Sequence, residues 1–284
     1  MLSVDDEPYG LSRTLELLTS TFISCLSCIS DSYNSDSGIS LHVDPQVDIY
    51  TYTDLQLISF FCSTINLPVS YTLGGCEALR DLMEIASLAA CTVQVSEVDS
   101  IYAFKKLYSC FSQVYDEGSH LPTPSLTLSV TTPHGLEILP EILSLDEARL
   151  INTILLDRNS LHYFGLSDVT ISKSISIFRE TCTHSPHLAI CGAIDHKVSN
   201  VVSTYAPDYV FTKMFRVRAH PSYPAARLTL DEVITMLLFL ESNMLSYILS
   251  ARDAISNHIR SRREHLHQFL LSSQICNIQR RIIN

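Results

Sequence analysis

The sequence predicts an α/β protein built around a parallel sheet, either as a (β/α) barrel or as an open, doubly wound sheet. Short β-branched or apolar runs recur along the chain, and each gap between two runs is long enough for a helix. Parallel strands need such gaps, because a crossover takes about a dozen residues or more. The length of 284 residues also suits one α/β barrel. Both architectures bury their strands on two faces, so periodicity does not separate them.

Seven strands are expected, at residues 39–43, 69–73, 91–95, 126–130, 153–156, 187–190 and 209–212. An eighth strand is either short or lies before Gly38. No G-x-G-x-x-G or Walker motif follows the first run, which weakens a nucleotide-binding interpretation.

Helices are expected at both ends of the chain. One covers residues 11–30, and beyond Pro224 an apolar stripe from Val233 to Ile255 indicates a long helix that either caps the domain or packs on a neighbouring subunit. The expected organisation is a helical extension (1–37), a barrel body (38–228) and C-terminal helices (229–284).

The clearest single element is a strand that passes directly into a helix. Residues 69–73 are apolar or β-branched, whereas Leu82, Ile85 and Ala86 recur at helical spacing. Gly74 and Gly75 lie between them, and glycine permits the positive φ and the close approach to a ligand that such a turn requires. In an α/β protein a binding site is expected at this turn.

The composition argues against several partners and compartments. The formal net charge of −11 does not suit a nucleic-acid surface, which needs clustered Lys and Arg. Acidic residues near the start do not suit a secretory signal, and Glu241 interrupts the most apolar run, so neither export nor a membrane span is expected. The nine cysteines are odd in number and scattered, which favours a reducing, cytoplasmic compartment over a disulfide framework.

Four segments together resemble the HpcH/HpaI aldolase and citrate-lyase β-subunit family: 74–81 (GGCEALRD), 99–106 (DSIYAFKK), 130–143 (VTTPHGLEILPEIL) and 156–167 (LDRNSLHYFGLS). The likeness extends from about Gly38 to the C-terminal helices. It implies a (β/α)8 barrel of the TIM type. We expect this barrel to be preceded by the extra N-terminal helix and followed by the long C-terminal helices, which either close the barrel or mediate homo-oligomerisation. Family members are metal-dependent and act on 2-oxo acids or acyl thioesters, so the resemblance implies a small oxo acid or acyl substrate.

The chain departs from the family where the metal ligands are expected. Thr131 and Asn159 occupy the positions of a glutamate and an aspartate that hold Mg²⁺ or a similar cation in the family. Hard divalent cations prefer carboxylate oxygens, so Mg²⁺ or Mn²⁺ binding is expected to be weak or absent. A metal site relocated to His134 and His162, with Asp99 or Asp157, is an alternative.

Polar side chains remain at the strand ends, which share one face of a barrel. Those expected to be catalytic are Asp99, Asp157 and Lys213. Those expected to bind substrate are Asp44, Gly74, Gly75 and Glu77. Several have structural alternatives: Lys213 could pair with Asp44 or Asp157, Glu77 could serve the helix dipole, and Asp157 could cap the next helix or pair with Arg158.

Two functions are therefore open. The first is an aldolase-like or citrate-lyase-like carbon–carbon lyase, whose oxo acid or acyl substrate forms an enolate held by backbone N–H groups near Gly74 and Gly75 and by Lys213. The second is a catalytically inactive barrel that binds or scaffolds a partner. Loss of both acidic metal positions is what decay of catalysis predicts.

Overall fold

The structure is a computed structural model that describes residues 19–29, 39–44, 52–75, 79–88, 90–115, 122–181, 186–192, 198–220 and 228–244. The chain divides into two compact units, Thr19–Ser242 and a second unit that comprises Met1–Leu18 and Asn243–Asn284. Nearly all of the second unit lies outside the described residues. The predicted boundaries at 37/38 and 228/229 therefore stay predictions.

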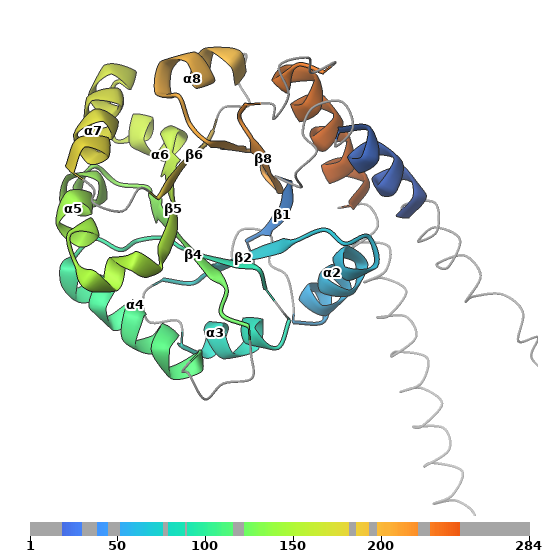
Figure 1. Ribbon diagram of the computed structural model, residues 1–284, viewed down its shortest axis with the longest axis horizontal. Coiled ribbons are helices and arrows are strands. Elements are labelled where there is room, and N and C mark those ends of the chain that lie inside the picture. Colours follow the sequence, from blue (N-terminus) through green and yellow to red (C-terminus); the bar gives the residue numbers. More distant parts are fainter. Residues whose placement is uncertain are drawn as a thin grey trace, which may run out of the picture. The chain divides into compact units, whose positions relative to one another are not determined.

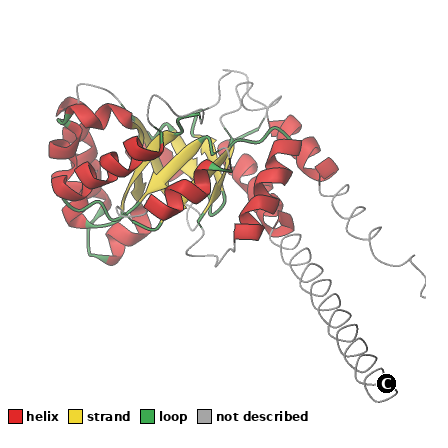
Figure 2. Ribbon diagram, turned by 90° about the horizontal axis from the view of Figure 1, so that it is seen from below, coloured by secondary structure: helices red, strands yellow, loops and turns green. Residues whose placement is uncertain are grey.

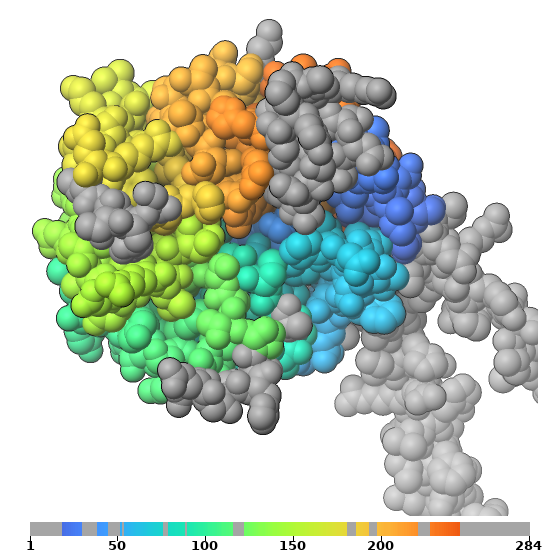
Figure 3. Space-filling model, in the orientation of Figure 1, coloured from blue at the N-terminus to red at the C-terminus, as the bar shows by residue number. Residues whose placement is uncertain are grey.

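The first unit is a closed eight-stranded barrel with helices on its outside (Figures 1 and 2), which confirms the predicted fold class. The strands follow in chain order around the barrel: β1 Ser40–Val43, β2 Val69–Leu73, β3 Thr92–Val95, β4 Ser125–Val130, β5 Ile151–Asp157, β6 His187–Cys191, β7 Tyr209–Phe211 and β8 Phe215–Arg218. The colours in the space-filling view run around the molecule in the same order (Figure 3), as sequential βα units require.

Helices connect most of the strands. Their bounds are α2 Tyr52–Thr64, α3 Leu79–Ala86, α4 Ile101–Val114, α5 Pro133–Leu143, the 3₁₀ helix η1 Asp146–Leu150, α6 Arg158–Tyr163, α7 Asp168–Thr181 and α8 Val198–Tyr205. Residues 19–29 and 230–244 are also helical. Several helices start on a side chain that accepts a hydrogen bond from the first turn: among them, Ser100, Thr132 and Asp157 occupy the N-cap positions of α4, α5 and α6.

The eighth strand differs from what was expected. It is short, but it does not lie before Gly38: β8 follows β7 after a three-residue turn and runs antiparallel to both β7 and β1. An antiparallel pair can be joined by a tight turn, whereas a parallel pair cannot. A search for runs separated by a helix therefore misses the alternating Phe215-Arg-Val-Arg218 segment.

Glu241, on the helix at 230–244, holds the turn between β7 and β8. Its carboxylate accepts a hydrogen bond from the Thr212 hydroxyl and one of 2.6 Å from the backbone N–H of Met214. Glu241 is only 6% exposed, and a buried carboxylate needs such donors. The residue that interrupts the apolar run thus fixes the turn in which Lys213 lies.

The barrel interior divides into two halves of different chemistry. Strand side chains alternate between the interior and the surrounding helices, and registered partners on parallel neighbours share a face. On β1 to β4 the inward residues form what we call the polar half: His42, Ser70, Thr72, Thr92, Gln94, Thr127 and Ser129. On β5 to β7 Leu155, Ala189, Tyr209 and Phe211 form a buried apolar cluster, the apolar half. Barrel interiors are usually filled by branched apolar residues, so the polar half is the exception.

Outside the apolar half, Asp168 joins α6, α7 and α8. Its two carboxylate oxygens accept hydrogen bonds of 3.1 Å from Nε and Nη2 of Arg158, and one of them also contacts His162 and the Tyr205 hydroxyl. The Arg158 guanidinium, followed by Tyr205 and His162, holds the pKa of the Asp168 carboxyl well below its ordinary value of 3.8. Burial and the contact with Asp168 raise the pKa of Tyr205 to about 12.

Candidate active site

A cavity of about 550 Å³ opens at the carboxyl ends of the parallel strands, the end at which barrel enzymes bind their substrates. Every strand from β1 to β7, or the residues directly after it, contributes to the wall. The residues that line this upper cavity are His42, Asp44, Thr72, Gln94, Ser96, Ser129, Thr131, Leu155, Asp157, Asn159, Cys191, Gly192, Phe211, Thr212 and Lys213. The polar half forms one wall, and Leu155 and Phe211 of the apolar half form the other.

Three of the residues predicted from the sequence meet in this cavity. Asp44 follows β1, Asp157 ends β5 and Lys213 lies in the turn between β7 and β8. Lys213 is exposed. A lysine at this position is suited to bind a carboxylate.

Asp157 is both a cavity residue and the cap of α6. One of its oxygens accepts a hydrogen bond of 3.2 Å from the backbone N–H of Ser160, and the other accepts one of 2.6 Å from the Ser160 hydroxyl. The predicted structural role of Asp157 as a helix cap is thus confirmed. Arg158 does not line the cavity, because it points to Asp168 on the outside of the barrel.

Thr131 and Asn159, the two positions at which the resemblance expects metal ligands, both line the cavity. The Asn159 side chain packs against Gly192, where a Cβ would lie 2.6 Å from Asn159 Cγ. In the described parts of the chain, no three His, Cys, Asp or Glu side chains gather closely enough to hold one metal ion. Thr131 and Asn159 offer a hydroxyl and an amide but no negative charge, so these two positions suit a divalent cation poorly, because such cations prefer carboxylate oxygens.

The histidines of the alternative metal site are not brought together. His134 is exposed on α5 and lies 3.7 Å from Glu137, whereas His162 contacts Asp168. Neither lines the upper cavity. A relocated site built from these two histidines is therefore wrong.

Asp99 and the glycine pair lie outside the cavity lining. Asp99 accepts a hydrogen bond of 3.0 Å from the Thr132 hydroxyl, which itself caps α5, so it supports the turn after β4. The N–H of Gly74 donates to Asp81 at 3.1 Å, and Gly75 adopts the expected positive φ of 111°. Glu77 lies outside the described residues.

The sequence interpretation missed His42, which points into the cavity from β1. Its Nε2 lies 3.1 Å from the Thr72 hydroxyl, and its Nδ1 lies 3.2 Å from the Ser70 hydroxyl. The imidazole and the Phe211 ring also form a T-shaped contact, with 5.5 Å between the centroids. A signal was present, because a histidine two residues before the strand-end Asp44 lies between the apolar residues Leu41 and Val43.

Gln94 and Cys191 complete the wall with neutral groups. Gln94 is 7% exposed, and its Oε1 has no hydrogen-bond partner among the described residues. Burial, then the negative charge of Asp157, raises the pKa of the Cys191 thiol. A thiol held neutral is a poor nucleophile, so the cavity offers hydroxyls, an imidazole and carboxylates rather than a thiolate.

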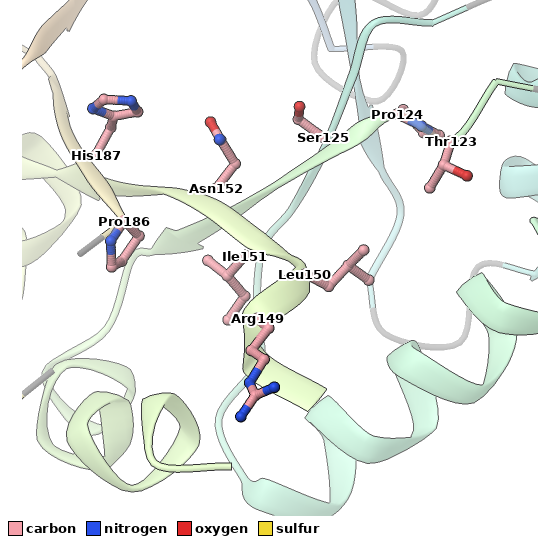
Figure 4. Close-up of a pocket in the computed structure, with 9 residues that line it drawn as sticks. All are labelled: Thr123, Pro124, Ser125, Arg149, Leu150, Ile151, Asn152, Pro186 and His187. Atoms are coloured by element: carbon pink, nitrogen blue, oxygen red, sulfur yellow. The ribbon is translucent and has the colours of Figure 1, made fainter. Parts of the chain in front are cut away.

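A second cavity, of about 330 Å³, lies at the opposite end of the barrel, where β4, β5 and β6 begin. Figure 4 shows Ser125, Asn152 and His187 along one side and Arg149 extending away from them. Arg149 is exposed and lies 3.4 Å from Asp146. This lower cavity therefore lacks the convergent charged groups of the upper one.

No helix in the described part of the chain has the length and hydropathy needed to cross a bilayer.

Comparisons with known proteins give structural neighbours only. No protein-family model and no curated protein matches the chain. Solved structures that match include a citrate synthase, SbnG (10% identity, TM-score 0.46, 57% of this chain and 71% of that one), and RipC from Yersinia pestis (12%, 0.41, 57% and 74%). Macrophomate synthase also matches (10%, 0.43, 66% and 73%). Identities and TM-scores this low assign no family, so the fold assignment rests on the strand order described above.

Proposed function

We propose that the protein is a carbon–carbon lyase of the aldolase or citrate-lyase type, which binds a small 2-oxo acid or acyl substrate in the upper cavity. The observation that carries this proposal is the meeting of Asp44, Asp157 and Lys213 in one cavity at the carboxyl ends of the strands. That arrangement offers one cation for a substrate carboxylate and two carboxylates for proton transfer.

Each charged residue has a role in this reaction. Lys213 binds the carboxylate of the substrate. Asp157 removes the proton from the substrate hydroxyl while the electrons of the breaking carbon–carbon bond move into the neighbouring carbonyl, and it returns that proton to the enolate carbon. Asp44 faces the remaining polar groups of the substrate, whereas Asp99 acts indirectly by holding Thr132 and the turn after β4.

No step of this proposal passes through a metal ion, because Thr131 and Asn159 supply no charge. We expect the wild-type protein to bind Mg²⁺ or Mn²⁺ more weakly than micromolar in calorimetry. Restoring both carboxylates with Thr131→Glu and Asn159→Asp creates measurable binding if only those two charges are missing. A double variant with no gain would mean that the two segments are wrongly matched to the metal loops of the family.

Binding of pyruvate and oxaloacetate, followed by ligand-observed NMR and calorimetry, tests the substrate class. Lys213→Met is expected to weaken binding by about tenfold or more, a loss of about 1.4 kcal/mol, because the carboxylate loses its cation. Lys213→Arg should keep most of the affinity, and Lys105→Met, which removes an exposed lysine from α4, is the matched control. Absence of binding, or equal affinity in Lys213→Met, would refute the proposal.

A barrel that binds such ligands without converting them is the second candidate. It is favoured by the neutral residues at both positions that the resemblance assigns to metal ligands and by the engagement of both Asp157 oxygens with Ser160. Prolonged incubation with oxaloacetate and related acids, followed by NMR detection of new products, separates the two. Binding without product formation would select this second function.

A further inference from the structure

A hydroxyl–imidazole pair lies on the polar wall of the upper cavity, and the proposed cleavage does not use it. Thr72 on β2 and His42 on β1 face the cavity side by side, 5% and 7% exposed. The distance of 3.1 Å from Thr72 Oγ1 to His42 Nε2 is within hydrogen-bond reach. A nucleophile and a base in contact inside a cavity is the arrangement that activates a hydroxyl for attack.

The partners of Ser70 favour one assignment of the imidazole proton of His42. The Ser70 hydroxyl has one hydrogen, and it donates this hydrogen to the backbone carbonyl of Leu41 at 3.2 Å. In this assignment Ser70 Oγ accepts from Nδ1 of His42, which lies 3.2 Å away. A neutral imidazole protonated on Nδ1 keeps its lone pair on Nε2, so the Thr72 hydroxyl donates to that nitrogen.

We propose that Thr72 is a nucleophile, that His42 is its general base, and that Ser70 orients the imidazole, so that the cavity transfers or hydrolyses an acyl group carried by an ester or a thioester. Hydroxyl nucleophiles are generally activated in this way: the nucleophile contacts a base, and the base contacts a third group that orients it. The edge contact with Phe211 holds the imidazole plane from the opposite wall. This inference rests on the proposed function in one respect, that the same cavity receives the substrate.

The reaction needs only the acyl donor and water. Thr72 Oγ1 attacks the acyl carbonyl carbon while its proton passes to His42 Nε2. The bond to the alcohol or thiol breaks with its electron pair, and His42 gives the proton to this leaving group. Water then attacks the acyl-Thr72 ester, His42 takes a proton from that water, and the carboxylic acid leaves as Thr72 recovers its proton.

Gln94 is placed to stabilise the negative oxygen of the tetrahedral intermediate. It is the registered neighbour of Thr72 on β3, and its buried Oε1 has no protein partner among the described residues. The two ends of an amide are interchangeable by rotation, so the same position can present an N–H donor to the cavity. A single donor of this kind contributes about a hundredfold or more in rate.

The test uses p-nitrophenyl acetate as a neutral acyl donor with the full-length protein. We expect a burst of p-nitrophenol and an acetyl group on the peptide that contains Thr72, located by mass spectrometry. Thr72→Val should abolish the burst and the adduct, whereas Thr72→Ser should keep both. Thr127→Val, which removes another threonine hydroxyl from the barrel interior outside the cavity, is the matched control and should acylate like the wild type.

The base and the orienting residue are tested in the same assay. His42→Gln should slow acylation by about a hundredfold or more. Ser70→Ala should slow it less, and Ser70→Thr should restore the rate, a rescue that a merely structural role of Ser70 does not predict.

An adduct on Lys213, on Cys191 or on any other residue, or an unchanged burst in Thr72→Val, would overturn this inference. The location of the adduct in the wild-type protein decides the matter even if a variant fails to fold. Acylation of Thr72 in a protein that does not bind pyruvate would refute only the oxo-acid branch of the proposed function. Pyruvate binding without an adduct would refute only the nucleophile.

Discussion

The two halves of the barrel interior are stabilised by different interactions. In the apolar half, Leu155, Phe211, Tyr209 and Ala189 pack together and remove apolar surface from water. In the polar half, hydroxyl, imidazole and amide groups occupy the same layers, and the buried oxygens Gln94 Oε1 and Thr127 Oγ1 have no described partner. The apolar half therefore contributes stability, whereas the polar half sacrifices some of it to present polar groups at the upper cavity.

Truncating the apolar half should have the largest effect. Leu155 is 2% exposed, and Leu155→Ala should lower the free energy of unfolding by about 3 kcal/mol, because it removes buried methyl groups and leaves a cavity. Ser129→Ala, in the polar half, should cost less than about 1 kcal/mol. Urea unfolding of both variants measures this difference, and equal losses would contradict the division into halves.

The second largest loss of stability is expected at Asp168, whose contacts join α6, α7 and α8 outside the apolar half. Asp168→Ala leaves the Arg158 guanidinium, whose side chain is 10% exposed, without its carboxylate. We expect a loss of about 2 kcal/mol, at the lower end for such a pair because the Asp168 side chain is 42% exposed and partly screened by solvent. Adding Arg158→Met should recover part of this loss, and a double variant as unstable as the single one would argue against an unpaired charge as the cause.

The same junction should make stability depend on acid. Since the folded-state pKa of Asp168 is lowered from 3.8, its contribution is present above that pH and is lost as pH falls through the lower folded value. The free energy of unfolding, measured across this acid range, should fall less steeply with decreasing pH in Asp168→Asn than in the wild type. Parallel curves would assign the acid sensitivity to other carboxylates.

The smallest expected effect has the opposite sign. Thr127 is 1% exposed and its hydroxyl has no described partner, so Thr127→Val keeps the shape and removes a buried polar group. We expect stabilisation by about 1 kcal/mol, measured by the shift of the urea midpoint. Destabilisation would show that the hydroxyl is satisfied, for example by a bound water.

The regular part of the fold could be predicted from the sequence because strands and helices leave local patterns in it. The run at residues 69–73 matches β2 Val69–Leu73 in both bounds, and each of the other expected strands overlaps an observed one. β8 was missed because a four-residue strand after a tight turn has no helix-length gap to mark it. Which residues face the interior is likewise a matter of barrel closure, which a strand buried on both faces does not reveal by its own periodicity.

The charged part of the site was easier to predict than the neutral part. Asp44, Asp157 and Lys213 were found because charged residues at strand ends stand out against apolar runs, and barrel topology places these ends on one face. The contact between Thr72 and His42 joins residues 30 positions apart on two strands, and it depends on their register. The partner of Arg158 was not predicted for a related reason: Asp168 becomes close only when α6 and α7 fold beside each other.

The tight turn that places Lys213 at the mouth also sets the order of events on the ribosome. The edge of β1 that does not face β2 has no partner strand until β8 has been synthesised, because Ser40 and Leu41 pair with Arg216 and Phe215. A nascent chain that ends before Phe215 therefore exposes unpaired edges on both β1 and β7, which are sites for association with other chains. Ring closure and completion of the lysine-bearing turn are one late step of synthesis.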